Sequence, residues 1–291
     1  MKNVFCIFLF VSTFCSSVFA QEEKIIPPNI YFVNDTLGCD ITEVANMDYL
    51  FYQYSMLKNK DSAKVGHYSE YLKVWVGDEP LPTYMGHPKT RLHPVVGLSL
   101  EQAKEYARWR TLAVCLRWYH KQRLISQNTV DEYENRTLEE FAEEFSEIVK
   151  KYPYFEYRIP TSQEWNICFE TIENDLKENK SRYKRFKRLA EKWSPYNFKD
   201  LEIDKQSEYY VEEVPLAAVV DSERKFKRFL KIYGLKGGVA EMVSDAPVAM
   251  GGSWKDNSEE FERVKMQEFK EPNAWTGFRC VGSWKKWKSN E

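Results

Sequence analysis

Apolar side chains recur at helical spacing in the first two thirds of the chain. One run follows Asn46, a residue type that caps helix N-termini, and it consists of Met47, Leu50, Phe51, Tyr54 and Leu57. Two further helices are predicted from capping boxes, in which side chains three residues apart bind each other's backbone N–H groups. These boxes are Ser99–Gln102 and Thr161–Glu164, so we expect a helix to begin at each.

Both of these later helices have an apolar face that suits a hydrophobic core. The first face carries Ala103, Tyr106, Ala107, Ala113 and Leu116, and the second carries Trp165, Cys168, Phe169 and Ile172. The C-terminal third has no long helical period and is interrupted by glycine and proline. This mixture predicts an α+β fold with low regular secondary structure.

Two helical patterns with strongly charged faces lie near 118–150 and 177–193. The first is acidic and contains Glu139, Glu140, Glu143, Glu144 and Glu147. The second is basic and places Arg182, Lys184, Arg185, Lys187 and Arg188 beside Tyr183, Phe186 and Trp193. Two interpretations stay open: solvated helix faces, or acidic and basic surfaces that bind protein partners.

The N-terminus has the pattern of a secretory signal. An apolar run follows Lys2 and ends at Ala20, which predicts cleavage after Ala20 and export, although a membrane anchor is the alternative. Phe14 precedes Cys15 where a lipoprotein signal needs a small residue, so no lipid anchor is expected. We expect residues 21–291 to form a single domain without a transmembrane segment. The net charge of −2 argues against bulk nucleic-acid binding.

Four cysteines follow the predicted cleavage site: Cys39, Cys115, Cys168 and Cys280. Export permits disulfides, and four cysteines allow three pairings. Buried free thiols are the alternative.

Glycine–aromatic blocks follow one another in the C-terminal third: Gly237–Met242, Gly251–Trp254 and Gly277–Cys280. Upstream blocks are Asp40–Asn46, His93–Ser99 and Arg158–Trp165. In order and spacing they resemble the formylglycine-generating (sulfatase-modifying) enzyme family, with its G-N-V-W-E-W, G-G-S-W/Y and G-F-R-C blocks. The resemblance implies an irregular, C-type-lectin-like fold. The family's disulfides do not transfer, because two of their cysteines fall on Ala107 and Phe169.

The oxidase chemistry of that family requires copper held by two thiolates. Counted from Ser253, the thiolate positions fall on Asp256 and Phe261, and no cysteine lies between Gly252 and Gly277. Because Cu(I) prefers soft sulfur ligands, these positions are degenerate and no copper is expected. The chain is therefore expected to be non-catalytic.

The resemblance also implies structural calcium in two loops. The matching positions are Asn197, Phe198, Glu208 and Tyr210 in the first, and Gly237, Val239 and Glu241 in the second. Oxygen ligands of this kind suit a hard cation. The second loop lacks one side-chain ligand, because Gly234 stands where the family has Asn or Asp. The alternative is that Glu208 and Glu241 only cap turns.

Lys255-Asp256 and Trp109-Arg110-Thr111 are similar to the gliding-motility and type IX secretion members of the family in Bacteroidota. That similarity implies that the protein binds partners or acts as a scaffold in a bacterial envelope assembly. It also implies a periplasmic or outer-membrane location, with envelope proteins as partners. An oligomer or ring is the implied assembled form. Arg182, Lys184, Arg185 and Arg188 are the expected partner surface. A divergent enzyme of the family and a carbohydrate- or peptide-binding module are the alternatives.

Overall fold

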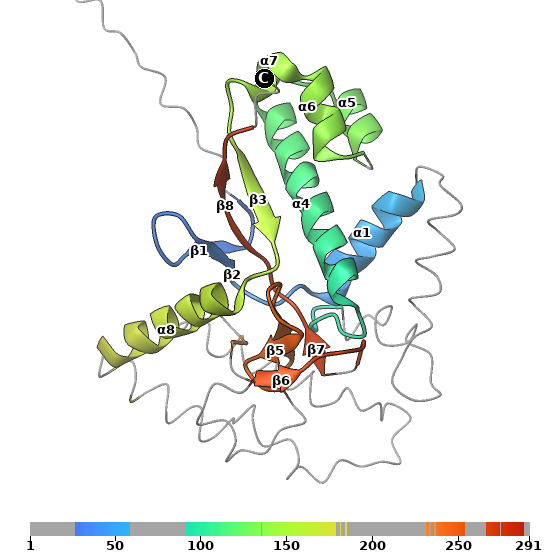
Figure 1. Cartoon of the computed structure of the whole chain (residues 1–291). Helices are drawn as coiled ribbons and strands as arrows, with labels where there is room; N and C mark the ends of the chain where they lie inside the picture. Colours follow the sequence, from blue (N-terminus) through green and yellow to red (C-terminus); the bar gives the residue numbers. More distant parts are fainter. Residues whose placement is uncertain are drawn as a thin grey trace, which may run out of the picture.

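The fold combines helices with short strands, as Figure 1 shows. The computed structural model describes residues 27–58, 91–134, 136–178, 181, 184, 231–232, 234–235, 237–253, 266–273 and 275–287. The helices are α1 (Asn46–Lys58), α4 (Leu100–Lys121), α5 (Gln127–Tyr133), α6 (Leu138–Glu144), α7 (Ser146–Val149) and α8 (Ser162–Glu178). The strands are β1 (Ile30–Phe32), β2 (Gly38–Asp40), β3 (Tyr154–Arg158), β4 (Ala240–Met242), β5 (Val248–Met250), β6 (Met266–Glu268), β7 (Thr276–Gly277) and β8 (Val281–Lys285). This content confirms the predicted α+β class.

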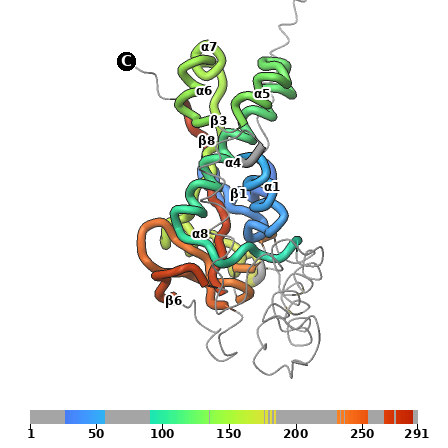
Figure 2. Tube along the Cα trace, turned by 90° about the vertical axis from the view of Figure 1, so that its right-hand side faces the viewer, coloured from blue at the N-terminus to red at the C-terminus, as the bar shows by residue number. Residues whose placement is uncertain are grey.

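The strands form two sheets. In the first, the order is β1-β2-β8-β3 and all neighbours are antiparallel. Its longest pairing joins β3 to β8 over five residues, from Tyr154 opposite Lys285 to Arg158 opposite Val281. The second sheet has the order β6-β5-β4-β7, in which β4 and β7 are parallel. Helices α5–α7 lie at one end of the molecule and the second sheet at the other (Figure 2).

Both predicted capping boxes are present. Ser99 accepts from the Gln102 N–H at 3.2 Å while Gln102 Oε1 accepts from the Ser99 N–H at 2.8 Å. Thr161 and Glu164 exchange the same pair of bonds at 3.2 and 3.0 Å. The apolar faces predicted for α4 and α8 are also confirmed, because their residues are buried or packed against the core.

The run predicted after Asn46 does form helix α1, and Leu50 packs against the core, but three members of the predicted apolar stripe are exposed. Met47, Phe51 and Tyr54 are 48%, 43% and 64% exposed, whereas Tyr49 and Tyr52 are fully buried. Tyr49 stacks on Tyr106 with ring centroids 5.8 Å apart, so the face of α1 with the tyrosine rings packs on α4.

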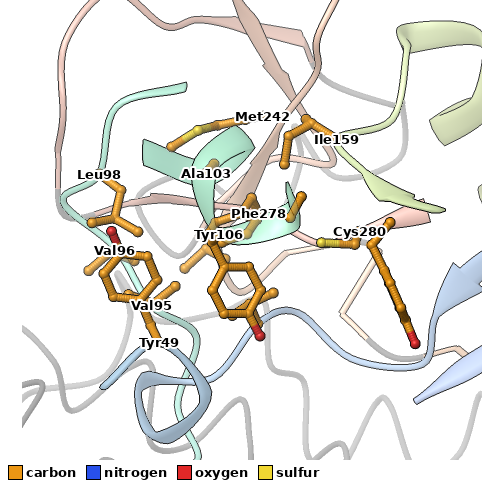
Figure 3. Close-up of a cluster of buried hydrophobic side chains, with 14 of the residues drawn as sticks. Tyr49, Val95, Val96, Leu98, Ala103, Tyr106, Ile159, Met242, Phe278 and Cys280 are labelled. Atoms are coloured by element: carbon orange, nitrogen blue, oxygen red, sulfur yellow. The ribbon is translucent and has the colours of Figure 1, made fainter. Parts of the chain in front are cut away.

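Three hydrophobic clusters form the core of the described residues. Cluster 1 packs α1 and α4 against β3, β4 and the segments before α4 and β8, and Figure 3 shows part of it. Cluster 2 lies between α8, the β1–β2 hairpin and the β4–β5 hairpin. Cluster 3 joins α5–α7 to the C-terminal half of α4 around the buried Phe141.

The acidic pattern near 118–150 thus folds as small helices whose apolar side is buried and whose five glutamates are exposed: Glu139, Glu140, Glu143, Glu144 and Glu147. In the basic pattern near 177–193, Lys184 is helical and exposed. Arg182, Arg185 and Arg188 lie outside the described residues. None of the helices in the described part of the chain combines the length and apolar character that a bilayer crossing requires.

Candidate functional site

The sequence blocks that carry the family resemblance meet through backbone hydrogen bonds. Val44 N donates to Phe278 O at 3.0 Å, and Val95 N donates to Val44 O at 2.9 Å. Ser244 N donates to Pro160 O at 2.8 Å, and Gly237 N to Gly251 O at 3.0 Å. Segments far apart in the sequence therefore converge on one region between the two sheets.

A buried ionic network occupies this region; we define it as Asp40, Glu43, Arg110, Glu241 and Arg279. Arg279 lies at its centre. Its Nε donates to Glu241 Oε2 at 2.7 Å and its Nη2 donates to Glu241 Oε1. Its Nη1 donates to the backbone oxygen of Asp40 at 2.9 Å. A bidentate pair of this kind is the geometry in which a buried guanidinium is best satisfied.

Trp165 connects helix α8 to the network. Its Nε1 donates to Glu241 Oε2 at 2.7 Å, and its ring stacks on Phe169 with centroids 5.6 Å apart. Gly251 lies against the same ring with φ of +94°, and an added Cβ would stand 2.8 Å from the Leu235 oxygen. Only glycine suits this position, which explains the first residue of the Gly251–Trp254 block.

Arg110 forms the second buried ion pair. Its guanidinium donates to both Asp40 oxygens, at 2.7 and 2.8 Å, and lies 4.0 Å over the centre of the Tyr157 ring. Asp40 Oδ2 also accepts from the Cys280 N–H at 2.9 Å. Thr111 Oγ1 accepts a hydrogen bond of 2.9 Å from the backbone N–H of Tyr157 on β3. The Arg110-Thr111 pair therefore binds α4 to the first sheet.

Glu43 is the least well compensated member of the network. Its Oε2 is 4.0 Å from Arg279 Nη2, and its Oε1 has no hydrogen-bond partner among the described residues. Burial raises the pKa of Glu43 to about 7, a rise that the Arg279 charge opposes and the Glu241 charge increases. The Glu43 side chain is therefore mainly the neutral acid inside the fold below about pH 7.

The raised pKa of Glu43 makes the stability dependent on pH. Between about pH 4.5 and 7 the folded state holds a proton that the unfolded state releases, so the free energy of unfolding should fall as pH rises through this window. Glu43→Gln should reduce that fall by about 1–3 kcal/mol, since one pKa unit corresponds to about 1.4 kcal/mol. Urea unfolding at pH 5 and pH 8 measures it. Glu139→Gln, at an exposed carboxylate, is the control, and equal pH slopes for Glu43→Gln and wild type would contradict the assignment.

The predicted calcium positions fall partly within the described residues. Gly237 and Val239 are buried and lead directly into the network through Glu241. Both Glu241 oxygens accept hydrogen bonds from Arg279, and one also accepts from Trp165. A calcium ion would thus compete with Arg279 for this carboxylate. Asn197, Phe198, Glu208 and Tyr210 lie outside the described residues, so calcium stays a prediction.

The degenerate copper positions, Asp256 and Phe261, also lie outside the described residues, which stop at the buried Ser253 and resume at Met266. Across the described ranges there is no group of three or more His, Cys, Asp or Glu side chains placed to hold a metal. Sequence reasoning missed the buried ionic network. Its signal was the set of charged residues inside the sequence blocks: Glu241 and Arg279 in the glycine–aromatic blocks and Asp40 in the upstream block Asp40–Asn46.

Comparison with known proteins agrees with the block pattern. The family model described as the sulfatase-modifying factor enzyme 1-like domain matches residues 39–284, which is most of the chain. No curated protein and no solved structure gives a significant match. The matched range begins at β2 and ends inside β8, so it contains every residue of the buried ionic network. The chain belongs to the sulfatase-modifying factor enzyme 1-like family.

Proposed function

We propose that this chain is a non-catalytic family member that acts as a protein-binding or scaffold component of a bacterial envelope assembly. The observation that supports the proposal most directly is the lack of copper-binding side chains after Ser253. The stretch between Gly252 and Gly277 contains no cysteine, and the two positions of the copper thiolates hold Asp256 and Phe261. A carboxylate and a phenyl ring cannot replace a thiolate pair for Cu(I).

The other cysteines do not supply the missing ligands. Cys39, Cys115, Cys168 and Cys280 are all buried, and they sit in the three clusters of the core. Burial raises the pKa of the Cys115 and Cys280 thiols to about 12, which disfavours the thiolate that binds copper. The residues present therefore do not fit the family's copper.

The buried ionic network supports a scaffold role. The ion pairs of the buried ionic network join α4 to β2 and β4 to the segment before β8, and they use both oxygens of Asp40 and Glu241. Helix α8 is joined to the network by the Trp165 hydrogen bond to Glu241. A scaffold held in this way can carry added segments, and additions to a rigid fold commonly provide binding specificity. Helices α5–α7 are such a segment, and so is the predicted basic helix near 177–193.

Two sequence details favour the gliding-motility and type IX secretion branch. They are Trp109-Arg110-Thr111 on α4 and Lys255-Asp256 after the Gly251–Trp254 block. On this proposal the fold has C-type-lectin-like topology, the chain is exported to the periplasm or the outer membrane, and its partners are envelope proteins. Arg and aromatic side chains together are typical of binding hot spots, which favours the basic segment as the contact surface.

The double variant Arg185→Glu/Arg188→Glu tests this surface. It should fold normally but recover less of an envelope partner in a quantitative pull-down, and the difference should shrink as salt increases. Lys104→Glu/Arg108→Glu on the exposed side of α4 makes the same change in net charge and is the matched control. Identical co-purifying proteins for wild type and both variants at low salt would exclude the basic segment as the contact surface.

A further inference from the structure

Cys39 and Cys168 both lie in cluster 2, and in this structure both are buried free thiols, as are Cys115 and Cys280. Cys39 lies on β2, where neighbouring side chains alternate between the two faces of the sheet. Asp40 points toward Arg110, so Cys39 points to the opposite face. There it meets α8, whose buried side chains Trp165, Cys168 and Ile172 recur at helical spacing. The Cys39 Sγ donates to the backbone oxygen of Asp40 at 3.5 Å, and Cys168 is the neighbouring side chain with the largest effect on the pKa of the Cys39 thiol.

The fold separates the other two cysteines from this pair. Cys280 packs in cluster 1 beside Tyr106 and Phe278 (Figure 3), whereas the next residue, Val281, packs in cluster 2. Cys280 and Cys39 therefore lie on opposite faces of the first sheet. Cys115 lies in cluster 3 with Tyr119. Of the six possible pairs among these four cysteines, only Cys39 and Cys168 belong to the same cluster.

We propose that Cys39 and Cys168 form a disulfide that fastens helix α8 to strand β2. A disulfide of the glutathione or thiol-oxidoreductase class is the oxidant. The two cysteine thiols lose two electrons and two protons as the Cys39 Sγ–Cys168 Sγ bond forms, and the oxidant's S–S bond is reduced to two thiols. The linked residues enclose roughly 130 residues, and cross-links across long loops restrict the unfolded chain most.

The environment of Cys39 determines when the bond forms. Burial raises the pKa of the Cys39 thiol well above its usual range, and the contact with Cys168 adds to the rise. Because the thiolate is the attacking species, exchange is slow once the core has closed. The disulfide therefore forms while the chain folds, before α8 covers β2, and is afterwards shielded from reductants.

Refolding the full chain in a glutathione redox buffer tests the proposal. The reduced, unfolded protein is diluted into a mixture of reduced and oxidised glutathione, then denatured with N-ethylmaleimide and mapped by peptide mass spectrometry. We expect one linked peptide pair that contains Cys39 and Cys168, while Cys115 and Cys280 carry the maleimide. The oxidised protein should also melt several degrees above the same sample after reduction.

Two variants sharpen the test. Cys168→Ala should leave no linked peptide and no difference in melting between oxidised and reduced samples, whereas Cys115→Ala, at an equally buried thiol, should keep both. Maleimide on all four of the cysteines that follow Ala20 in refolded wild type, or a link through Cys115 or Cys280, would overturn the proposal. Since wild-type mapping alone gives this answer, a variant that fails to fold does not affect it.

Discussion

Glu241→Gln should lower the free energy of unfolding by about 3–5 kcal/mol, because it removes the closest counter-charge of the buried Arg279 guanidinium and leaves only the more distant Glu43. Both side chains are fully buried, and three hydrogen bonds end on the Glu241 carboxylate. Chemical denaturation monitored by tryptophan fluorescence and circular dichroism measures the loss. We expect the midpoint to move while the dependence on denaturant stays similar.

Two comparisons separate this effect from a general cost of mutation. Glu105→Gln breaks an exposed ion pair with Arg108 and should cost less than about 1 kcal/mol. The double variant Glu241→Leu/Arg279→Met removes both charges and should recover a substantial part of the loss, because no uncompensated charge remains. A Glu241→Gln protein as stable as Glu105→Gln would show that the ion pair does not hold the fold together.

Trp165→Ala should cost a similar amount, about 3–5 kcal/mol, because it opens a cavity between α8 and the second sheet. Trp165 is fully buried, stacks on Phe169 and donates to Glu241. Trp165→Phe retains an aromatic ring but removes the donor to a buried carboxylate, and it should cost about 1–3 kcal/mol. Thermal melting followed by circular dichroism ranks the two variants.

The control for this prediction is Tyr54→Ala, which truncates an aromatic side chain that is 64% exposed. It should change the free energy of unfolding by less than about 0.5 kcal/mol. If Trp165→Ala and Tyr54→Ala melt alike, then α8 does not pack on the network as described.

Local signals made the helices predictable, whereas the sheets depend on distant contacts. The capping boxes at Ser99 and Thr161 act within one turn, so sequence alone locates the starts of α4 and α8. Strand β8 lies between β2 and β3, and each of these neighbours is more than a hundred residues away in the sequence. Strands of three to five residues carry too little periodicity to reveal such partners.

A local sequence pattern also could not predict which side chains contact each other across the fold. The stripe of α1 that contains Met47 and Phe51 has helical spacing, yet the buried face is the one with Tyr49 and Tyr52, since those rings contact Tyr106 on α4. In the same way, Glu241 was predicted as a calcium ligand from its block alone. Its contact with Arg279 arises only when β4 and the segment before β8 come together.

Anaerobic titration with Cu(I) in competition with a chromophoric chelator tests the central claim most directly. The comparison is between wild type and Asp256→Cys/Phe261→Cys, which restores sulfur at both positions of the missing thiolates. The account predicts that wild type does not withdraw copper from the chelator and does not convert a cysteine-containing sulfatase peptide to formylglycine, whereas the restored variant gains copper binding. Wild-type protein that binds one Cu(I) as tightly as the restored variant, or that forms formylglycine, would contradict the non-catalytic assignment.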